Sequence, residues 1–267
     1  MRVLCLNCWG GTLADALLDY IASTGADVLC LQEVIHTPSA PAQVLTYRDA
    51  FRTLPQRARL LDELSAVLPD HHVTFCPTAR GPLWHGDTAY PSLWGIATFT
   101  RKSLPVIAQT SRFVHGAFGE DGFGDEPRSR TAHALRLWAG RPITIAHMHG
   151  LRAPAGKGDT PARAAQADRF IALVQNVAAP GDSLILCGDF NVRPDSETIT
   201  KLRALGLTER VTADGHKTTR TAHYTKPEPY ADYMFVSKDL KDAPFQVITN
   251  PEPSDHTPLI LTLPSSG

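Results

Sequence analysis

The chain has 267 residues, 43% of them hydrophobic, which is enough to bury a core in one large domain or two small ones. Its 26 Lys and Arg residues are balanced by 27 Asp and Glu residues, so it lacks the basic surplus usual in proteins dedicated to nucleic acid. No shift in composition divides the sequence, and we expect a single domain over residues 1–267.

The beginning of the sequence and its cysteines favour a reducing compartment. The first residues lack the features of a signal peptide, and no apolar run reaches membrane-spanning length. The five cysteines are an odd number without the paired spacing of a metal site: Cys5, Cys8, Cys30, Cys76 and Cys187. We therefore expect a cytoplasmic protein with buried thiols and no stable membrane association.

The opening third predicts a strand–helix–strand unit followed by irregular chain. Residues 2–7 are an apolar run, residues 12–24 have the helical apolar interval, and residues 27–33 form a second buried run. The remainder of this third predicts a loop at 36–44, a helix at 56–68, a strand at 72–76, a surface loop at 81–92 and a strand at 93–100.

The rest of the chain continues this alternation of strands and helices. Strands are expected at 104–110, 131–138, 142–148, 183–187, 230–236, 245–249 and 257–263. Helices are expected after Thr160, a suitable N-cap, and at 196–205, with long polar loops at 114–129 and 150–159. Many strands with few helices predict an α/β fold in which two packed, mostly antiparallel sheets are flanked by helices.

The strongest local motif is Gly188-Asp189-Phe190-Asn191, which directly follows an apolar strand. Residues two apart in an extended chain point the same way, so Asp189 and Asn191 can address one ligand while Phe190 packs inward. A carboxylate beside an amide suits a hydrated hard cation and a phosphoryl oxygen. Taken alone, the tetrapeptide also fits a simple strand-to-turn corner.

Four other polar positions lie at or near the ends of apolar strands. They are Asn7, Glu33 in Leu31-Gln32-Glu33, Asp232 in an apolar strand, and the pair Asp255-His256 before the last strand. An unpaired charge inside such a strand is costly, so Asp232 needs a partner. Oxygen ligands without clustered thiols favour Mg²⁺ or Mn²⁺, and a bound cation with a positioned base is suited to hydrolysis of a phosphate ester.

This ordered set of residues, together with His147, resembles the endonuclease/exonuclease/phosphatase superfamily, and the match covers nearly the whole chain. That group includes pancreatic deoxyribonuclease, abasic-site endonucleases, neutral sphingomyelinases and inositol polyphosphate phosphatases. The resemblance implies a four-layer α/β sandwich and a Mg²⁺- or Mn²⁺-dependent phosphoesterase. The segment His147-Met148-His149-Gly150 departs from the abasic-site endonuclease pattern and makes a DNA-repair role less expected.

The resemblance also implies a role for each position. Glu33 is the expected principal metal ligand, assisted by Asn7 and Asp255. Asp189 is expected to orient or deprotonate the attacking water, and Asn191 to hold the water or a phosphoryl oxygen. The remaining three are expected around the phosphate: His256 as base or donor, Asp232 as its hydrogen-bond partner, and His147 as the second histidine.

Several further residues are candidates for substrate contact. His149 lies on the same strand face as His147 and can share or take over its role. Arg152, Lys157 and Arg130 can bind a phosphate or a carboxylate, although solvated loop charges are an equal alternative. Among the tryptophans, Trp84 in its polar loop is a better substrate candidate than Trp94, for which packing is the safer interpretation.

Three functions therefore remain open. The first is hydrolysis of a small or medium phosphodiester or phosphomonoester, with no protein partner implied. The second is a metal-dependent DNA or RNA nuclease, which needs a local electropositive groove that the neutral charge balance does not promise. The third, from another class, is a catalytically silent binding module, against which the complete set of site residues argues. The superfamily fold itself does not select among substrates.

Overall fold

The computed structural model describes residues 1–49, 52–153 and 155–264 and contains two sheets. The larger has eight strands, in the order β13 (Phe245–Val247), β14 (Leu259–Thr262), β1 (Arg2–Asn7), β2 (Val28–His36), β6 (Thr88–Arg101), β5 (His71–His85), β3 (Val44–Arg48) and β4 (Thr53–Arg57). The smaller has six, in the order β11 (Thr208–Glu209), β12 (Asp232–Val236), β10 (Ser183–Asp189), β9 (Pro142–His149), β8 (Arg130–Trp138) and β7 (Val106–His115).

Both sheets are mixed but mostly antiparallel. The parallel pairs are β1 with β2 and β9 with β10, and the other ladders are antiparallel. Each parallel pair is joined by a crossover helix, α1 (Ala14–Ser23) in the first and α3 (Pro161–Gln175) in the second. The four parallel strands direct their carboxyl ends toward the region where polar residues were predicted.

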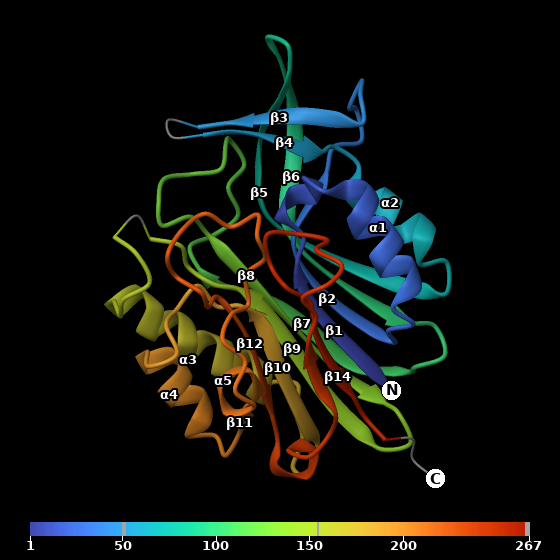
Figure 1. Ribbon diagram of the computed structural model, residues 1–267, viewed down its shortest axis with the longest axis vertical. Coiled ribbons are helices and arrows are strands. Elements are labelled where there is room, and N and C mark those ends of the chain that lie inside the picture. Colours follow the sequence, from blue (N-terminus) through green and yellow to red (C-terminus); the bar gives the residue numbers. More distant parts are fainter. Residues whose placement is uncertain (50–51, 154, 265–267) are drawn as a thin grey trace.

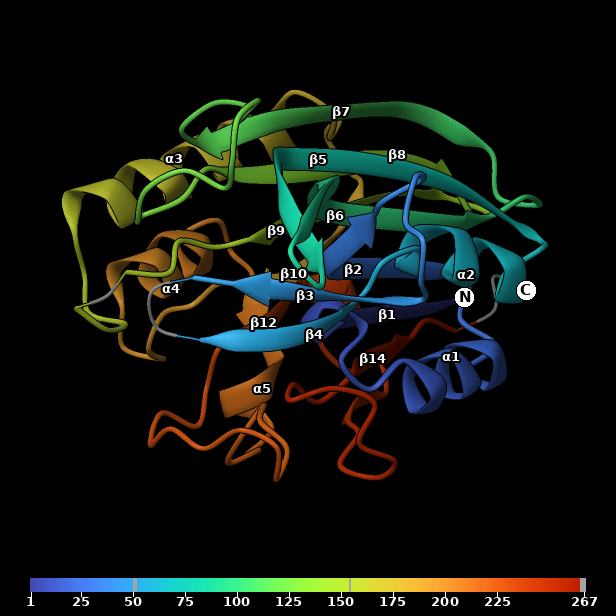
Figure 2. The ribbon, with the colours of Figure 1, turned by 90° about the horizontal axis from the view of Figure 1, so that it is seen from above.

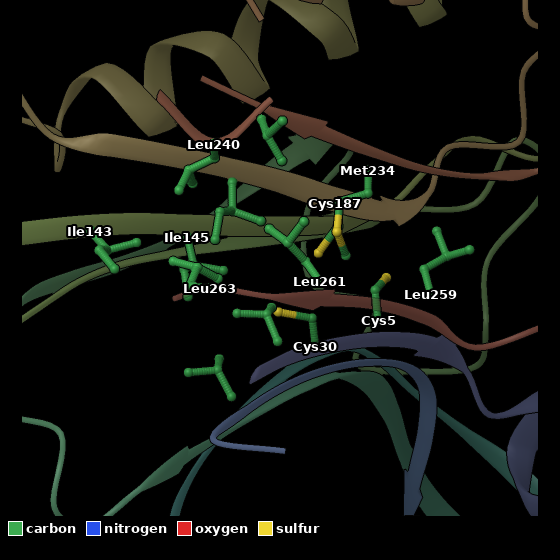
Figure 3. Close-up of a cluster of buried hydrophobic side chains, with 14 of the residues drawn as sticks. Cys5, Cys30, Ile143, Ile145, Cys187, Met234, Leu240, Leu259, Leu261 and Leu263 are labelled. Carbon is green, nitrogen blue, oxygen red and sulfur yellow. The ribbon is translucent and has the colours of Figure 1, made fainter. Parts of the chain in front are cut away.

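The sheets pack face to face through a continuous apolar layer (Figure 3). Cys5 and Cys30 from the larger sheet meet Cys187 from the smaller one, among Leu, Ile and Val side chains. The cysteines are free thiols and, as predicted, all five are buried. They contribute as small apolar side chains to the layer that fixes how the two sheets are stacked.

Helices cover the outer faces and complete four layers (Figures 1 and 2). α1 and α2 (Leu60–Val67) pack on the larger sheet, and α3 and α4 (Glu197–Arg203) pack on the smaller one. Thr160 is the N-cap of α3, as predicted, and its hydroxyl accepts from the Arg163 N–H. Short helices η1 (Trp9–Gly11), α5 (Arg210–Ala213) and η2 (Lys238–Leu240) complete the described elements. The α/β sandwich predicted from the sequence is confirmed.

The predicted surface loop at residues 81–92 is wrong, because this segment is the end of a long hairpin formed by β5 and β6. Pro82 and Pro91 lie opposite each other near its tip, and prolines and glycines suppress the alternating pattern by which a strand is recognised. The predicted helix at 56–68 is also too long, since β4 occupies its first residues and pairs with β3. In Figure 1 this β3–β4 hairpin crosses the upper part of the β5–β6 arm.

No helix in the described parts of the chain is both long and apolar enough to cross a lipid bilayer.

Candidate active site

The site begins at a bulge in β2. The register between β2 and β6 shifts between Leu31 and Val34, and Glu33 within the shift has a positive φ of 55°. Asn191, just after β10, has a φ of 53°. Left-handed conformations in non-glycine residues are strained and cluster at functional sites. Both strained residues belong to the set predicted from the sequence.

Asn7, at the end of β1, links the two central carboxylates. Its side-chain amide donates to Glu33 Oε1 at 3.3 Å and to Asp189 Oδ2 at 3.0 Å, while its carbonyl accepts from the Trp9 N–H at 2.9 Å. Burial and the nearby Asp189 carboxylate raise the pKa of Glu33. Two carboxylates held this close favour a cation between or beside them.

His256 and Asp232 form a buried pair next to these carboxylates. His256 Nδ1 lies 2.9 and 2.8 Å from the two Asp232 oxygens. Burial raises the pKa of Asp232 to about 6 and lowers the pKa of His256 to about 4. At neutral pH the carboxylate is therefore ionised and the imidazole neutral, so Nδ1–H donates to Asp232 and Nε2 keeps its lone pair. That nitrogen lies 3.8 Å from Asp189 Oδ2.

The two histidines of β9 have different surroundings. His149 Nε2 lies 3.7 Å from Glu33 Oε1 and 3.8 Å from Asp189 Oδ2, and its ring lines the cleft. His147 points the same way but lies deeper between the sheets, where its ring nitrogens meet Gln32 at 3.2 Å and Thr98 at 2.8 Å. The expectation that His147 faces the phosphate therefore requires correction: the position that faces the cleft belongs to His149.

Arg220 is a cleft residue that the sequence did not indicate. Its guanidinium contacts His256 Nε2 and Asp255 Oδ2, the latter at 3.3 Å, and its Cζ lies 4.0 Å from the Tyr224 ring centroid. Its Nε is buried and has no hydrogen-bond partner among the residues that the structure describes. The threonine-rich segment around Arg220 has no sequence pattern that predicts a site residue. Arg220 reaches the site through an isolated β-bridge with His256 rather than from a regular strand.

Basic residues of the 150–159 loop and of the helix after it divide into structural and cleft-facing groups. The Arg163 guanidinium donates to the carbonyls of Leu151, Gly156 and Gly158, so it fixes the loop rather than a ligand. Lys157 is buried and donates to the Tyr230 carbonyl, and burial lowers the pKa of its ammonium group. Arg152 also lines the cleft.

Arg130 completes the cationic side of the cleft. It is only 3% exposed, and its guanidinium donates to the carbonyls of Gly150 and Ser129 at 2.8 and 3.2 Å. Its Cζ lies 5.7 Å from the Trp94 ring centroid. Arg130 lines the cleft, and its acceptors within hydrogen-bonding distance are neutral carbonyls rather than carboxylates, so its positive charge can act on an anion there.

A cavity of about 520 Å³ joins these groups. Its lining includes Glu33, Asp189, Asn191, Asp255 and His256 from the predicted catalytic and metal set, and His149, Arg130, Arg152 and Lys157 from the candidate substrate contacts. Trp94 also lines the cavity, whereas Trp84 stacks with Arg48 on the β5–β6 arm. The preference for Trp84 over Trp94 as a substrate contact therefore does not fit the structure.

The donor set fits a hard divalent cation. Glu33, Asp189 and Asp255 supply carboxylate oxygens around the cleft. Burial, and then the Asp189 carboxylate, raise the pKa of Glu33, and a bound cation would favour its ionised form. Side-chain donor atoms of Asp189, Asp232 and His256 also lie within 4.8 Å of one another. Because His256 and Asp232 already bind each other, the Glu33 side is the better metal position. Asn7 presents its amide nitrogen there, so it supports the carboxylates in this arrangement.

Comparisons with known proteins agree with this architecture. Residues 4–256 match the model of the Endonuclease/Exonuclease/phosphatase family. No curated protein matches the chain significantly. An endonuclease/exonuclease/phosphatase structure from Bacteroides vulgatus has a TM-score of 0.66 and 15% identity, with 97% of each chain covered.

Two further structures of the same fold are described by function. The human Nocturnin catalytic domain with bound sulfate has a TM-score of 0.60 and 22% identity, covering 98% of this chain and 92% of that one. The mannosyl-6-phosphatase Bt3783 of Bacteroides thetaiotaomicron has a TM-score of 0.62 and 15% identity, covering 98% of both chains. The family match spans nearly the whole sequence, and the chain belongs to the endonuclease/exonuclease/phosphatase family.

Proposed function

We propose that this chain is a divalent-metal-dependent phosphoesterase that hydrolyses a small phosphodiester or phosphomonoester. The observation that carries the proposal is the position of His256 Nε2, 3.8 Å from Asp189 Oδ2 and backed by Asp232, beside the Asn7–Glu33 carboxylate cluster. A neutral base and a cation-binding cluster thus converge in one cleft. The family includes phosphatases and nucleases, and a structurally similar protein is named a mannosyl-6-phosphatase.

Glu33 would hold the cation, with Asp189 and Asp255 as further oxygen ligands. Mg²⁺ or Mn²⁺ bound there would withdraw charge from a phosphoryl oxygen and favour ionisation of water. We assign Mg²⁺ or Mn²⁺ because the proposed ligands are all oxygen atoms.

Side chains of this protein would orient the attacking water and accept its proton. Asp189 Oδ1 accepts the Asn191 N–H at 3.0 Å, an arrangement that fixes Asp189 for orienting a water molecule. Asp232 holds the His256 tautomer in which Nε2 can accept a proton from that water. Asn191 would contact the water or a phosphoryl oxygen through its side-chain amide.

Arg220, Lys157, Arg130 and His149 would surround the phosphate with donors. Arg220 already contacts His256 Nε2, so an incoming phosphate would take over its guanidinium and leave that nitrogen free for the proton. A guanidinium can donate two parallel hydrogen bonds to phosphate, which gives it both charge and geometry. Arg152, at the rim, is a weaker candidate for the same anion.

The experiment compares the two histidines of one strand. Hydrolysis of a generic phosphodiester, a generic phosphomonoester and plasmid DNA is measured with Mg²⁺ and Mn²⁺ for wild type, Asp189→Asn, His149→Gln and His147→Gln. We expect kcat to fall about 100-fold or more in the first two variants, in the range of a lost general base or charge donor. His147→Gln is the matched control because it lies outside the cleft.

Each outcome decides a separate part of the proposal. Turnover of the small esters alone supports the small-substrate assignment, and preferential cleavage of plasmid DNA would replace it with a nuclease. Equal loss in His147→Gln and His149→Gln would contradict the assignment of His149. Metal binding without turnover of any substrate would favour a silent binding module.

A further inference from the structure

The cleft extends beyond the proposed phosphate site into a second compartment with different chemistry. Its walls contain the partly exposed rings of Tyr47, Trp94 and Phe123, over a floor that includes Ile35 and Leu83. The ring centroids of Tyr47 and Phe123 are 5.6 Å apart, and those of Trp94 and Phe123 are 6.4 Å apart. We call Tyr47, Trp94 and Phe123 the aromatic compartment. Exposed aromatic side chains gathered in one concave site are typical of ligand contact.

The aromatic compartment directly adjoins the catalytic groups. The Trp94 ring lies 5.4 Å from the His149 ring, centroid to centroid, and Arg130 is positioned over its face. A phosphate beside His149 would therefore direct its ester oxygen and first attached group toward Trp94. The group esterified to the phosphate, rather than a distant part of the substrate, is the one that this compartment would contact.

The charged side chains beside Tyr47 and Phe123 are paired with one another. Arg52 lies 3.7 Å from Asp49, and Arg128 lies 3.5 Å from Glu126 and 3.9 Å from Asp49. The Arg128 guanidinium also stacks near both Tyr47 and Phe123, at 5.7 Å from each ring centroid. Two cations shared with two carboxylates leave little attraction for a second phosphate. A neutral planar group, by contrast, can stack on the rings and on the guanidinium.

Phe123 is held in place by the attachment of its loop to β5 and by its contact with Gly81. The 116–129 loop is attached to β5 by backbone hydrogen bonds from the Arg80 N–H to the Gly119 carbonyl at 2.7 Å and from the Gly122 N–H to the Arg80 carbonyl at 2.9 Å. Gly81 lies under the Phe123 ring, where an added Cβ would come within 2.7 Å of three ring atoms. The absence of a side chain at residue 81 thus sets how close Phe123 lies to the arm.

We infer that the aromatic compartment selects phosphate esters whose esterified group is a neutral planar ring. This inference rests on the proposed phosphoesterase function and specifies its substrate class. The ring would insert beside Trp94 and Phe123, and the phosphate would remain with His149, Arg130 and Arg220. Esters with a small alkyl group or a second anionic group would lack this contact.

Non-hydrolysable phosphonates test the inference by ligand-observed NMR with Mg²⁺ present. The probes are methylphosphonate, phenylphosphonate and 3-phosphonopropionate, and benzyl alcohol reports on the ring without phosphorus. We expect phenylphosphonate to bind about 10-fold more tightly than methylphosphonate, the upper range for an aromatic contact. The advantage should disappear in Trp94→Leu and shrink in Gly81→Ala. Trp138→Leu, at an exposed position outside the cleft, should retain it.

The outcomes separate this inference from the proposed function. Equal binding of phenylphosphonate and methylphosphonate, or tighter binding of 3-phosphonopropionate, would overturn the aromatic assignment and leave the phosphate site standing. Benzyl alcohol binding that depends on Trp94, without binding of any phosphonate, would support the compartment and contradict the phosphoesterase. A phenyl advantage that persists in both Trp94→Leu and Gly81→Ala would also overturn the inference. If Trp94→Leu does not fold, Gly81→Ala still tests the inference, because it displaces Phe123 and should reduce the tighter binding of phenylphosphonate.

Discussion

Replacement of Asp232 by Asn should lower activity and raise stability together. The Asp232 side chain is 1% exposed, and its pKa is raised to about 6 from an ordinary value of 3.8. A difference of about 2 pKa units corresponds to about 3 kcal/mol by which ionised Asp232 destabilises the fold at neutral pH. Because the folded chain binds this proton more tightly than the unfolded chain, that destabilisation develops as the pH rises from about 4 to about 6.

The asparagine side chain carries no charge and avoids this penalty, although it forms a weaker hydrogen bond with His256. We therefore expect the free energy of unfolding of Asp232→Asn at pH 7.5 to exceed that of wild type by about 1–2 kcal/mol, which is the penalty of about 3 kcal/mol less about 1–2 kcal/mol for the weaker bond. We expect kcat to fall about 100- to 10,000-fold, because the His256 tautomer is no longer fixed.

Urea unfolding and steady-state hydrolysis measure the two effects on one preparation. Asp182→Asn is the control of opposite sign: despite burial, hydrogen bonds from Arg136, Ala179 and Thr144 lower the pKa of Asp182, so its replacement should destabilise the fold. A destabilised Asp232→Asn variant with unchanged kcat would refute the assigned role of Asp232.

The remaining predictions concern the buried polar network and the backbone near the site. Burial lowers the pKa of His133 to about 4, so its contribution to stability is present above pH 6.5 and is lost, up to about 3 kcal/mol, as the pH falls toward 4. In urea unfolding, His133→Gln should reduce this fall in the free energy of unfolding, whereas the control His85→Gln, at an exposed position, should leave it unchanged. The same pH dependence in His133→Gln as in wild type would contradict the role given to His133. Gly150→Ala should destabilise the fold by about 3 kcal/mol or more, because its Cβ would lie 2.2 Å from the Phe190 carbonyl oxygen. Gly158→Ala, with no atom within 4 Å of an added Cβ, should unfold like wild type, and equal stability of the two variants would contradict the packing described at Gly150.

Much of the site was predictable because its residues end, begin or interrupt apolar strands. Parallel strands β1 with β2 and β9 with β10 bring their carboxyl ends together, so Asn7, Glu33 and Asp189 converge from segments far apart in sequence. The apolar period identifies the strands, and a polar residue that interrupts or bounds the apolar run is then visible without any structure. His256 and Asp232 were found for the same reason.

Other features depend on information that a linear pattern lacks. His147 and His149 share a strand face, and only their depth between the sheets separates a residue bonded to Gln32 and Thr98 from one in the cleft. Arg220 reaches the site through an isolated bridge to His256, which has no periodic signature. The β5–β6 arm was missed because its Gly and Pro residues resemble a loop. Of the aromatic compartment, the sequence indicated only Trp94, as the less favoured candidate, and gave no signal for Tyr47 or Phe123.

The most direct test of the central claim is metal-dependent turnover after chelation. The protein is stripped with EDTA, dialysed, and assayed for phosphate-ester hydrolysis during titration with Mg²⁺ or Mn²⁺, beside Glu33→Gln. We predict no turnover in the stripped protein, recovery on titration, and a metal affinity reduced about 10-fold or more in Glu33→Gln, as expected from loss of a charged ligand. Full turnover in the stripped protein, or a Glu33→Gln variant that binds metal and turns over like wild type, would contradict a metal-dependent phosphoesterase centred on Glu33.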